Sequence, residues 1–414
     1  LSIALCCSLG SAQSVQAEMT QIASNEDISL LSALSQQNLV QALVKRNAQI
    51  IYTQMQMGIS AQQVNFEKGV FESEFYTTVR NDSTHTLNTA TESLSRYSTN
   101  VFDEKNASIE SGLKTIASTG AEVKVGYQVG NRTNNIIPMR TPTQDTERSG
   151  SVVVTLKQPL LRGWGNQSIN SKIEQAKLDQ EVSFFQYKQQ LLRTVSDGLT
   201  AYWQLYRAKE IVSIRTQALD NARKTANDVQ ARLSAGRSSS KDILEAKATV
   251  ASREAELQTA FQLYTDSEAK VRTLLNIQSH AVKEMPIALQ DLPVQAILSL
   301  PKDFNQYYEE ILKEWPSYLI SKNKALIESQ NIIAAEDEKK SRLDMNLGYT
   351  THGLTYNDDY FKQSWSTDYP SWYVSLDYSV PLNGNERATA KENIAKDRKK
   401  QNEIPKWIPL FLDT

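Results

Sequence analysis

The sequence predicts an α+β membrane protein in which antiparallel strands alternate with very long helices. Several short segments alternate apolar and polar residues, which is typical of strands with one apolar face. From Asn166 to about Ala235 there is no proline and apolar residues recur at helical spacing; about 68 helical residues would span roughly 100 Å. The order helix, strand, loop, strand, turn, helix occurs twice, which indicates an internal duplication.

Composition limits the class of protein further. The chain has 414 residues, a net charge of −2 and 40% hydrophobic residues. Beyond the N-terminus, no stretch approaches the roughly 18 to 20 apolar residues of a spanning helix, which argues against a helical membrane protein. The strands of a transmembrane β-barrel alternate apolar and polar residues and so average to a polar composition, which means that a barrel is compatible with this sequence. The near-neutral charge argues against a nucleic-acid partner.

Residues 1–17 resemble the apolar core and small-residue cleavage site of a secretory signal peptide whose start is missing. We expect cleavage after Ala17, and a short buried helix is the alternative interpretation. Cys6 and Cys7 both lie in this segment, so the mature chain would have no disulfide or thiolate site. We find no catalytic motif and no cofactor-binding or metal-binding pattern, and therefore expect no enzyme. Asp358, Asp359 and Asp368 cluster in an expected surface loop, where solvation is a simpler interpretation than calcium binding.

We assign residues 18–285 to a first repeat. Its pattern predicts a helix, a strand, a long polar loop, a second strand and a third strand. We interpret the second strand as an extension of a barrel wall outside the membrane. These segments are, in order, Ile28 to about Phe66, Val70–Arg80, Asn81–Ser118, Gly120–Gly130 and Val152–Leu156.

A long helical hairpin completes this repeat. Gly236 suits the C-terminal cap of the helix that begins near Asn166. Ser239, followed three residues later by Asp242, resembles the capping start of a second helix that continues to about Asn276. The apolar spacing is close to the 3.5-residue period of coiled coils, so the two helices are expected to pack together.

Residues 286–400 form an incomplete second repeat. We expect a helix over Phe304–Lys340, interrupted at Trp315-Pro316, then strands near Leu343–Thr351 and Trp372–Val380 and the start of a charged helix. Residues 401–414 contain two prolines and an apolar cluster, which do not continue a coiled coil. A frameshift or truncation is the expected explanation of this atypical tail.

The two repeats share a strand-to-helix turn. Proline ends a strand because it cannot donate to the sheet, and glycine lets the chain redirect before the helix. The residues of these turns are Pro159, Leu160, Gly163 and Gly165 in the first copy, and Pro381, Leu382 and Gly384 in the second.

The strand number has a consequence for assembly. About four strands per chain cannot close a barrel, and lipid does not tolerate an open edge, so several copies must pool their strands; a trimer would supply twelve. The second strand pair is rich in aromatic residues, as at the membrane interfaces of barrels. The interface residues proposed are Tyr349, Trp372, Tyr373 and Tyr378. An aromatic-rich soluble sheet is the alternative.

Three stretches resemble the TolC-like outer-membrane efflux and secretion channel family. They are Gln158-Pro-Leu-Leu-Arg-Gly-Trp-Gly165, the segment Ala231–Glu245, and Arg342–Tyr349 with Val380–Gly384. The resemblance implies a homotrimer in the outer membrane of a Gram-negative bacterium, with a periplasmic extension. It also implies a passive exit duct for efflux or type I secretion, which works with a periplasmic adaptor and, through it, an inner-membrane pump.

The same resemblance places the adaptor-docking tip at Arg232, Leu233, Ser234, Gly236 and Asp242. A capped turn without a partner is the alternative interpretation of these residues. The family would continue through a second long hairpin after Lys400, where this sequence departs from it. A periplasmic coiled-coil adaptor or structural protein without a pore is the alternative function, although it does not need duplicated strand pairs.

Overall fold

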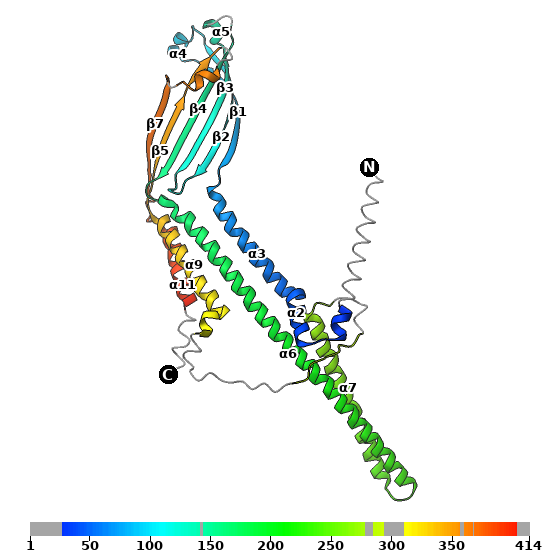
Figure 1. Ribbon diagram of the computed structural model, residues 1–414. Helices are drawn as coiled ribbons and strands as arrows, with labels where there is room; N and C mark the ends of the chain where they lie inside the picture. The colour runs from blue at the N-terminus through cyan, green and yellow to red at the C-terminus, as the bar shows by residue number, and fades with distance from the viewer. Residues whose placement is uncertain are drawn as a thin grey trace, which may run out of the picture. The chain divides into compact units, whose positions relative to one another are not determined.

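The computed structural model describes residues 27–140, 144–277, 285–293, 310–356, 360–366 and 368–403 (Figure 1). It forms two compact units, residues 1–58 with 183–317 and residues 59–182 with 318–414. Each unit is described by itself. The expected signal peptide and most of the expected atypical tail lie outside the described residues. Within the described ranges, no helix is both long enough and apolar enough to cross a membrane.

The second unit contains one antiparallel sheet with the order β1-β2-β3-β4-β5-β7, and a short β6 pairs with β4 (Figure 1). Short helices α4 (Ala90–Ser95), α5 (Ile137–Arg140) and α10 (Tyr360–Ser364) lie in its connections. The strands are β1 (Glu74–Leu87), β2 (Val101–Ile116), β3 (Glu122–Asn134), β4 (Thr146–Pro159), β5 (Arg342–Thr351), β6 (Gly353–Thr355) and β7 (Pro370–Ser379).

The sheet confirms the expected fold class but corrects the strand count. The segment 81–118, expected as a loop, contains the second half of β1 and all of β2. The strand expected near 120–130 is β3, which pairs with β2 on one side and β4 on the other. Six long strands therefore replace the expected four. Polar residues concealed β2 because only one of its faces is apolar, and only over part of its length.

Helix α9 (Pro316–Lys339) precedes the second strand pair and helix α11 (Glu386–Glu403) follows it. The expected interruption at Trp315-Pro316 is confirmed, because α9 begins at Pro316, where the missing N–H costs nothing. Lys339 binds Glu392 at 2.7 Å, and Lys391 binds Glu338 at 2.6 Å. These ion pairs join the end of α9 to α11.

In the first unit, the helix expected over Ile28–Phe66 is broken into pieces. Helices α2 (Gln36–Arg46) and α3 (Ala48–Lys68) are separated at Asn47. The Asn47 side chain accepts the N–H groups of Gln49 and Ile50 and donates to the carbonyl of Leu274, so it caps α3 and fixes the break. Ser35 caps α2 in the same way through the N–H of Asn38.

The long hairpin is confirmed. Helix α6 (Gln167–Ser234) has 68 residues and continues from one unit into the other, and α7 (Ser240–Leu274) has 35. Arg215 binds Glu256 at 2.7 Å, and Arg223 binds Glu254 at 2.8 Å across the pair. On the side of these ion pairs away from the tip, one apolar core joins α2, α6, α7 and neighbouring segments. Its fully buried members include Leu31, Leu34, Leu39, Leu43, Tyr202, Leu205, Val271 and Leu275.

Candidate functional site

The first candidate surface is the apolar face of the sheet. Register places one apolar or aromatic side chain of every long strand in a single row, because residues directly opposite each other in a sheet point to the same side. This apolar row consists of Phe75, Leu113, Val125, Val154, Tyr349 and Trp372. Leu113 is 55% exposed and Trp372 is 73% exposed, so the row is open to the surroundings at β2 and β7.

The opposite face is polar and its charges are paired. Lys124 on β3 binds Glu110 on β2 at 2.7 Å, and the Tyr76 hydroxyl on β1 donates to the same carboxylate at 2.6 Å. The Lys124 ammonium also lies 4.5 Å from the centroid of the Tyr76 ring. Lys114 binds Glu74 at 3.0 Å. The polar face therefore links β1, β2 and β3 by charged hydrogen bonds and suits contact with water.

The expected interface aromatics divide between the two faces. Tyr349, Trp372 and Tyr378 share the parity of the apolar row. Tyr373 points to the other side, where its ring covers Gly348; a Cβ on Gly348 would lie 2.1 Å from the ring. Neighbouring residues of a strand point to opposite faces, so Tyr373 does not share the face of the other three aromatics. Its place at a membrane interface stays a prediction.

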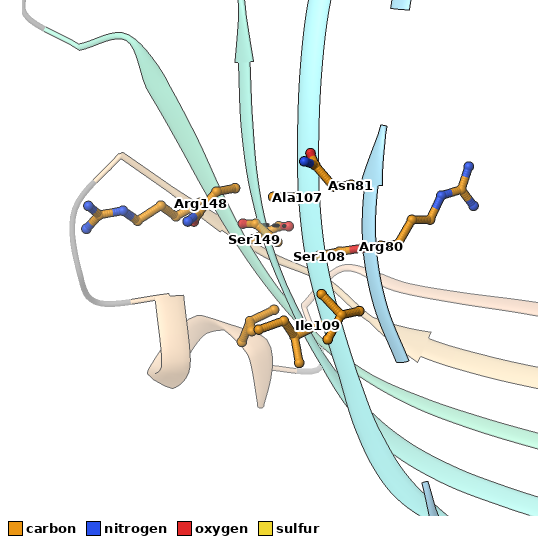
Figure 2. A pocket seen from close by; sticks show the side chains of 11 residues that line it. Arg80, Asn81, Ala107, Ser108, Ile109, Arg148 and Ser149 are labelled. Atoms are coloured by element: carbon orange, nitrogen blue, oxygen red, sulfur yellow. Dashed lines mark hydrogen bonds between the residues drawn. The ribbon is translucent and has the colours of Figure 1, made fainter. Parts of the chain in front are cut away.

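A shallow cavity of about 350 Å³ crosses β1 to β4 near Gly130. In Figure 2, Arg80 and Arg148 point to opposite sides of it, and Arg80 binds Asp82 at 2.9 Å. The Ser149 hydroxyl donates to the Gly130 carbonyl at 3.4 Å. The two guanidinium groups do not converge, so the cavity offers no focused anion site.

The strand-to-helix turns have the predicted backbone. The φ angles are +87° at Gly163, +66° at Gly165 and +70° at Gly384, a region that glycine enters without steric cost. Pro159 ends β4, whereas β7 ends at Ser379, so Pro381 follows the strand by two residues. The N–H of Leu160 donates to Leu343 at 2.7 Å and so joins the two repeats, while Leu382 is 95% exposed.

Sequence reasoning missed an asparagine in each turn. Asn166 and Asn385 have φ angles of +55° and +51°, which asparagine tolerates better than most residues. The Asn166 amide donates to the Ala117 carbonyl at 2.7 Å, and the Asn385 amide donates to the Glu338 carbonyl at 2.6 Å. The signal was present, because both copies read Gly-Asn immediately before the helix.

The helical tip forms the capped turn that its sequence predicts. Gly236 has a φ of +71°, its N–H donates to Leu233, and the N–H of Arg237 donates to Arg232. Ser234 donates to the carbonyl of Ala231.

Asp242 is occupied by the tip itself. Its carboxylate accepts the N–H of Ser239 and the hydroxyl of Ser238, both at 2.9 Å. These hydrogen bonds, with the backbone one foremost, lower the pKa of Asp242. Asp242 therefore caps α7, and Leu244, which is 67% exposed and was not predicted, offers the tip a free apolar side chain.

Within the described ranges, no group of three or more histidine, cysteine or acidic side chains could hold a metal ion. Asp358 and Asp359 lie outside these ranges. Asp368 accepts a hydrogen bond from the Ser366 hydroxyl at 2.6 Å, which closes a local turn.

Residues 120–276 match the sequence model of the family described as "Outer membrane efflux protein". The outer membrane efflux protein BepC of Brucella suis is 25% identical over 202 residues, which are 49% of this chain and 42% of that protein. The chain thus spans less than half the length of this curated relative.

Solved structures show the same fold. The outer-membrane channel OprN has a TM-score of 0.62 at 14% identity, over 91% of this chain and 71% of that one. The CmeC outer membrane channel of Campylobacter jejuni has a TM-score of 0.61 at 12% identity, over 91% and 68%. The strands, turns and hairpin of this chain therefore have the fold of the solved outer-membrane channels. The resemblance to the TolC-like efflux channel family is confirmed by the match of residues 120–276 to the outer membrane efflux protein family and by the shared fold.

Proposed function

We propose that this chain is a subunit of an outer-membrane channel that serves as a passive exit duct for efflux or type I secretion. Copies of the chain pool their strands into a closed wall, with lipid on the apolar side chains of β3, β4, β5 and β7 and water on the polar face. Three copies are expected from the family resemblance. The long hairpin extends into the periplasm of a Gram-negative cell, and its tip meets an adaptor that connects it to an inner-membrane pump.

The single observation behind this proposal is the two-faced sheet with open edges. In the described part of the chain, neither β1 nor β7 pairs with another strand on its outer side. Unpaired N–H and C=O groups are not tolerated in lipid, so an edge strand of one copy must pair with an edge strand of the next. An exposed apolar row opposite a charged face matches lipid on one side and water on the other.

The tip supports the adaptor contact through its shape and its exposed groups. The capping hydrogen bonds fix the turn, while Arg232, Arg237 and Leu244 remain exposed. A rigid turn with two guanidinium groups and a leucine suits a complementary acidic and apolar surface on a partner.

Extraction and gel migration test the proposal. The chain, expressed with its natural flanking sequence in a Gram-negative host, should fractionate with the outer membrane. In detergent it should migrate as an oligomer without heating and as a monomer after boiling. A Val154→Arg variant should lose the oligomer, while Lys157→Arg on the polar face of the same strand should keep it. A freely soluble periplasmic monomer would overturn the channel and favour the coiled-coil adaptor.

A further inference from the structure

We propose that the β1–β2 hairpin is part of the membrane wall, so that each chain contributes six spanning strands and the pooled pore is wider than a four-strand chain would make. This inference rests on the proposed function, because it assumes that the apolar side chains of the other four long strands, β3, β4, β5 and β7, face lipid. It assigns a role to segment 81–118, which carries no sequence signal of a membrane strand.

Strand length supports this assignment. A spanning strand tilted at about 45° needs about 9 to 11 residues. β1 has 14 residues and β2 has 16, whereas β5 and β7 have 10 each. β1 pairs with β2 along its whole length, from Glu74 opposite Lys114 to Leu87 opposite Val101. The hairpin is therefore long enough to span, and it has no break where a loop could leave the wall.

The side chains support it independently. Phe75 and Leu113 continue the apolar row of the other four strands at the same level. Four residues further along β1 on the same face, Val79 lies opposite Ile109. All four are exposed, with Phe75 at 68% and Val79 at 71%. A hairpin that left the membrane would have no reason to keep apolar groups on the same face and level as Val125 and Val154.

The polar face fastens the hairpin to the wall. The Glu110 carboxylate receives both the Lys124 ammonium and the Tyr76 hydroxyl, so three strands are joined at one point. On the same polar face, Gly112 lies directly opposite Gly126, and the Tyr76 side chain covers the space that the two glycines leave open. Tyr76 therefore holds β1 against the wall, as Tyr373 does at Gly348 on the other edge.

Pore width follows from strand number. Strands about 4.8 Å apart and tilted by about 40° give a backbone diameter of roughly 24 Å for twelve strands and roughly 36 Å for eighteen. With about 5 Å of side chain on each side, the openings are roughly 14 Å and 26 Å. A helix is about 10 Å across, so the wider opening admits a folded helical hairpin and the narrower one does not. The cargo class thus extends to partly folded polypeptides.

Cysteine labelling tests whether the hairpin spans. In oligomers reconstituted in liposomes, with Cys6 and Cys7 replaced by serine, Leu113→Cys and Lys114→Cys are compared with a water-soluble maleimide. We expect Leu113→Cys to react at least about tenfold more slowly, because a thiol in lipid does not form the reactive thiolate. Equal rates at these neighbouring positions would overturn the inference.

Tyr349→Cys separates the two levels of the proposal. If Tyr349→Cys is protected but Leu113→Cys reacts freely, the channel stands and the six-strand wall fails. If both react freely, the lipid-facing sheet itself fails.

Conductance tests the width. β1 and β3 run in the same direction, because both are antiparallel to β2. Deleting residues 74–121 therefore joins Ser73 to Glu122 without reversing the chain. We expect the single-channel conductance in planar bilayers to fall about threefold, in proportion to the open area. An unchanged conductance would overturn the inference, and if the deletion does not assemble, the labelling result decides.

Discussion

The carboxylate of Asp337 accepts a hydrogen bond from the backbone N–H of Gly163 at 2.9 Å. Asp337 belongs to the end of α9 in the second repeat, whereas Gly163 belongs to the turn of the first. The same carboxylate binds Lys340 at 3.0 Å, and the residue is only 2% exposed. One buried acid thus holds the first strand-to-helix turn against the second repeat.

Removing this acid should destabilise the sheet unit. In Asp337→Ala the Gly163 N–H loses its partner, and an unsatisfied buried donor costs about 1–3 kcal/mol. We expect the temperature at which the unheated oligomer dissociates on a gel to fall. Glu336→Ala, next to it but exposed, is the matched control and should leave this temperature unchanged. Equal effects of the two substitutions would contradict the role of the Gly163 contact.

Gly236 should matter for docking and not for insertion. Its left-handed backbone costs a bulky residue about 1–2 kcal/mol, while its surroundings leave open space. Gly236→Val should therefore distort the tip and weaken crosslinking to the adaptor, with normal membrane insertion. Gly236→Asn, which tolerates this backbone, should retain most of the crosslinking. Undiminished crosslinking in Gly236→Val would argue against the tip as the docking site.

Glu392 should make the α9–α11 contact sensitive to acid. Hydrogen bonds from Lys339 and Lys396 lower its pKa from 4.5 to about 2. A carboxylate with a lowered pKa stabilises the folded state fully above about pH 4.5, and this contribution is lost as the pH falls towards 2.

We therefore expect Glu392→Gln to lower the melting temperature at pH 6 and to approach the unsubstituted chain near pH 2. Circular dichroism melts of the detergent-solubilised chain across this range measure the difference. Asp397→Asn is the control, because Asp397 is an exposed partner of Lys400 at 3.9 Å. A constant deficit from pH 6 to pH 2 would show that the charge of Glu392 is not the cause.

Tyr202 should be central to the helical unit. Its side chain is fully buried, and its hydroxyl donates to Asp291 at 3.0 Å and accepts from the Asp291 N–H at 3.2 Å. Tyr202→Phe removes the partner of the Asp291 N–H, although the Asp291 carboxylate keeps the N–H of Gln36 at 2.6 Å. The unsatisfied donor should destabilise the unit by about 1–3 kcal/mol. Urea unfolding followed by helical circular dichroism is the measurement. Tyr206→Phe, half-buried on the same helix, should change the unfolding midpoint little.

The sequence by itself determined the periodic elements. The long hairpin was predictable because helical spacing continues without proline, and Gly236, Ser239 and Asp242 mark its turn. The glycines of both strand-to-helix turns were predictable because only glycine enters their backbone region freely. In each case the information is local, within a few residues of the feature it determines.

Tertiary structure decided the features that depend on contacts between segments far apart in the sequence. β2 was concealed because its residues alternate only partly, and its apolar positions become a pattern only when they lie opposite Phe75 and Val125. The ring of Tyr373 covers Gly348 because β5 and β7 pair with these two residues opposite each other, which depends on register. Asp337 is buried against the first turn, and its partner Gly163 lies 174 positions away in sequence. Such relations depend on which segments meet in space, and no local pattern records that.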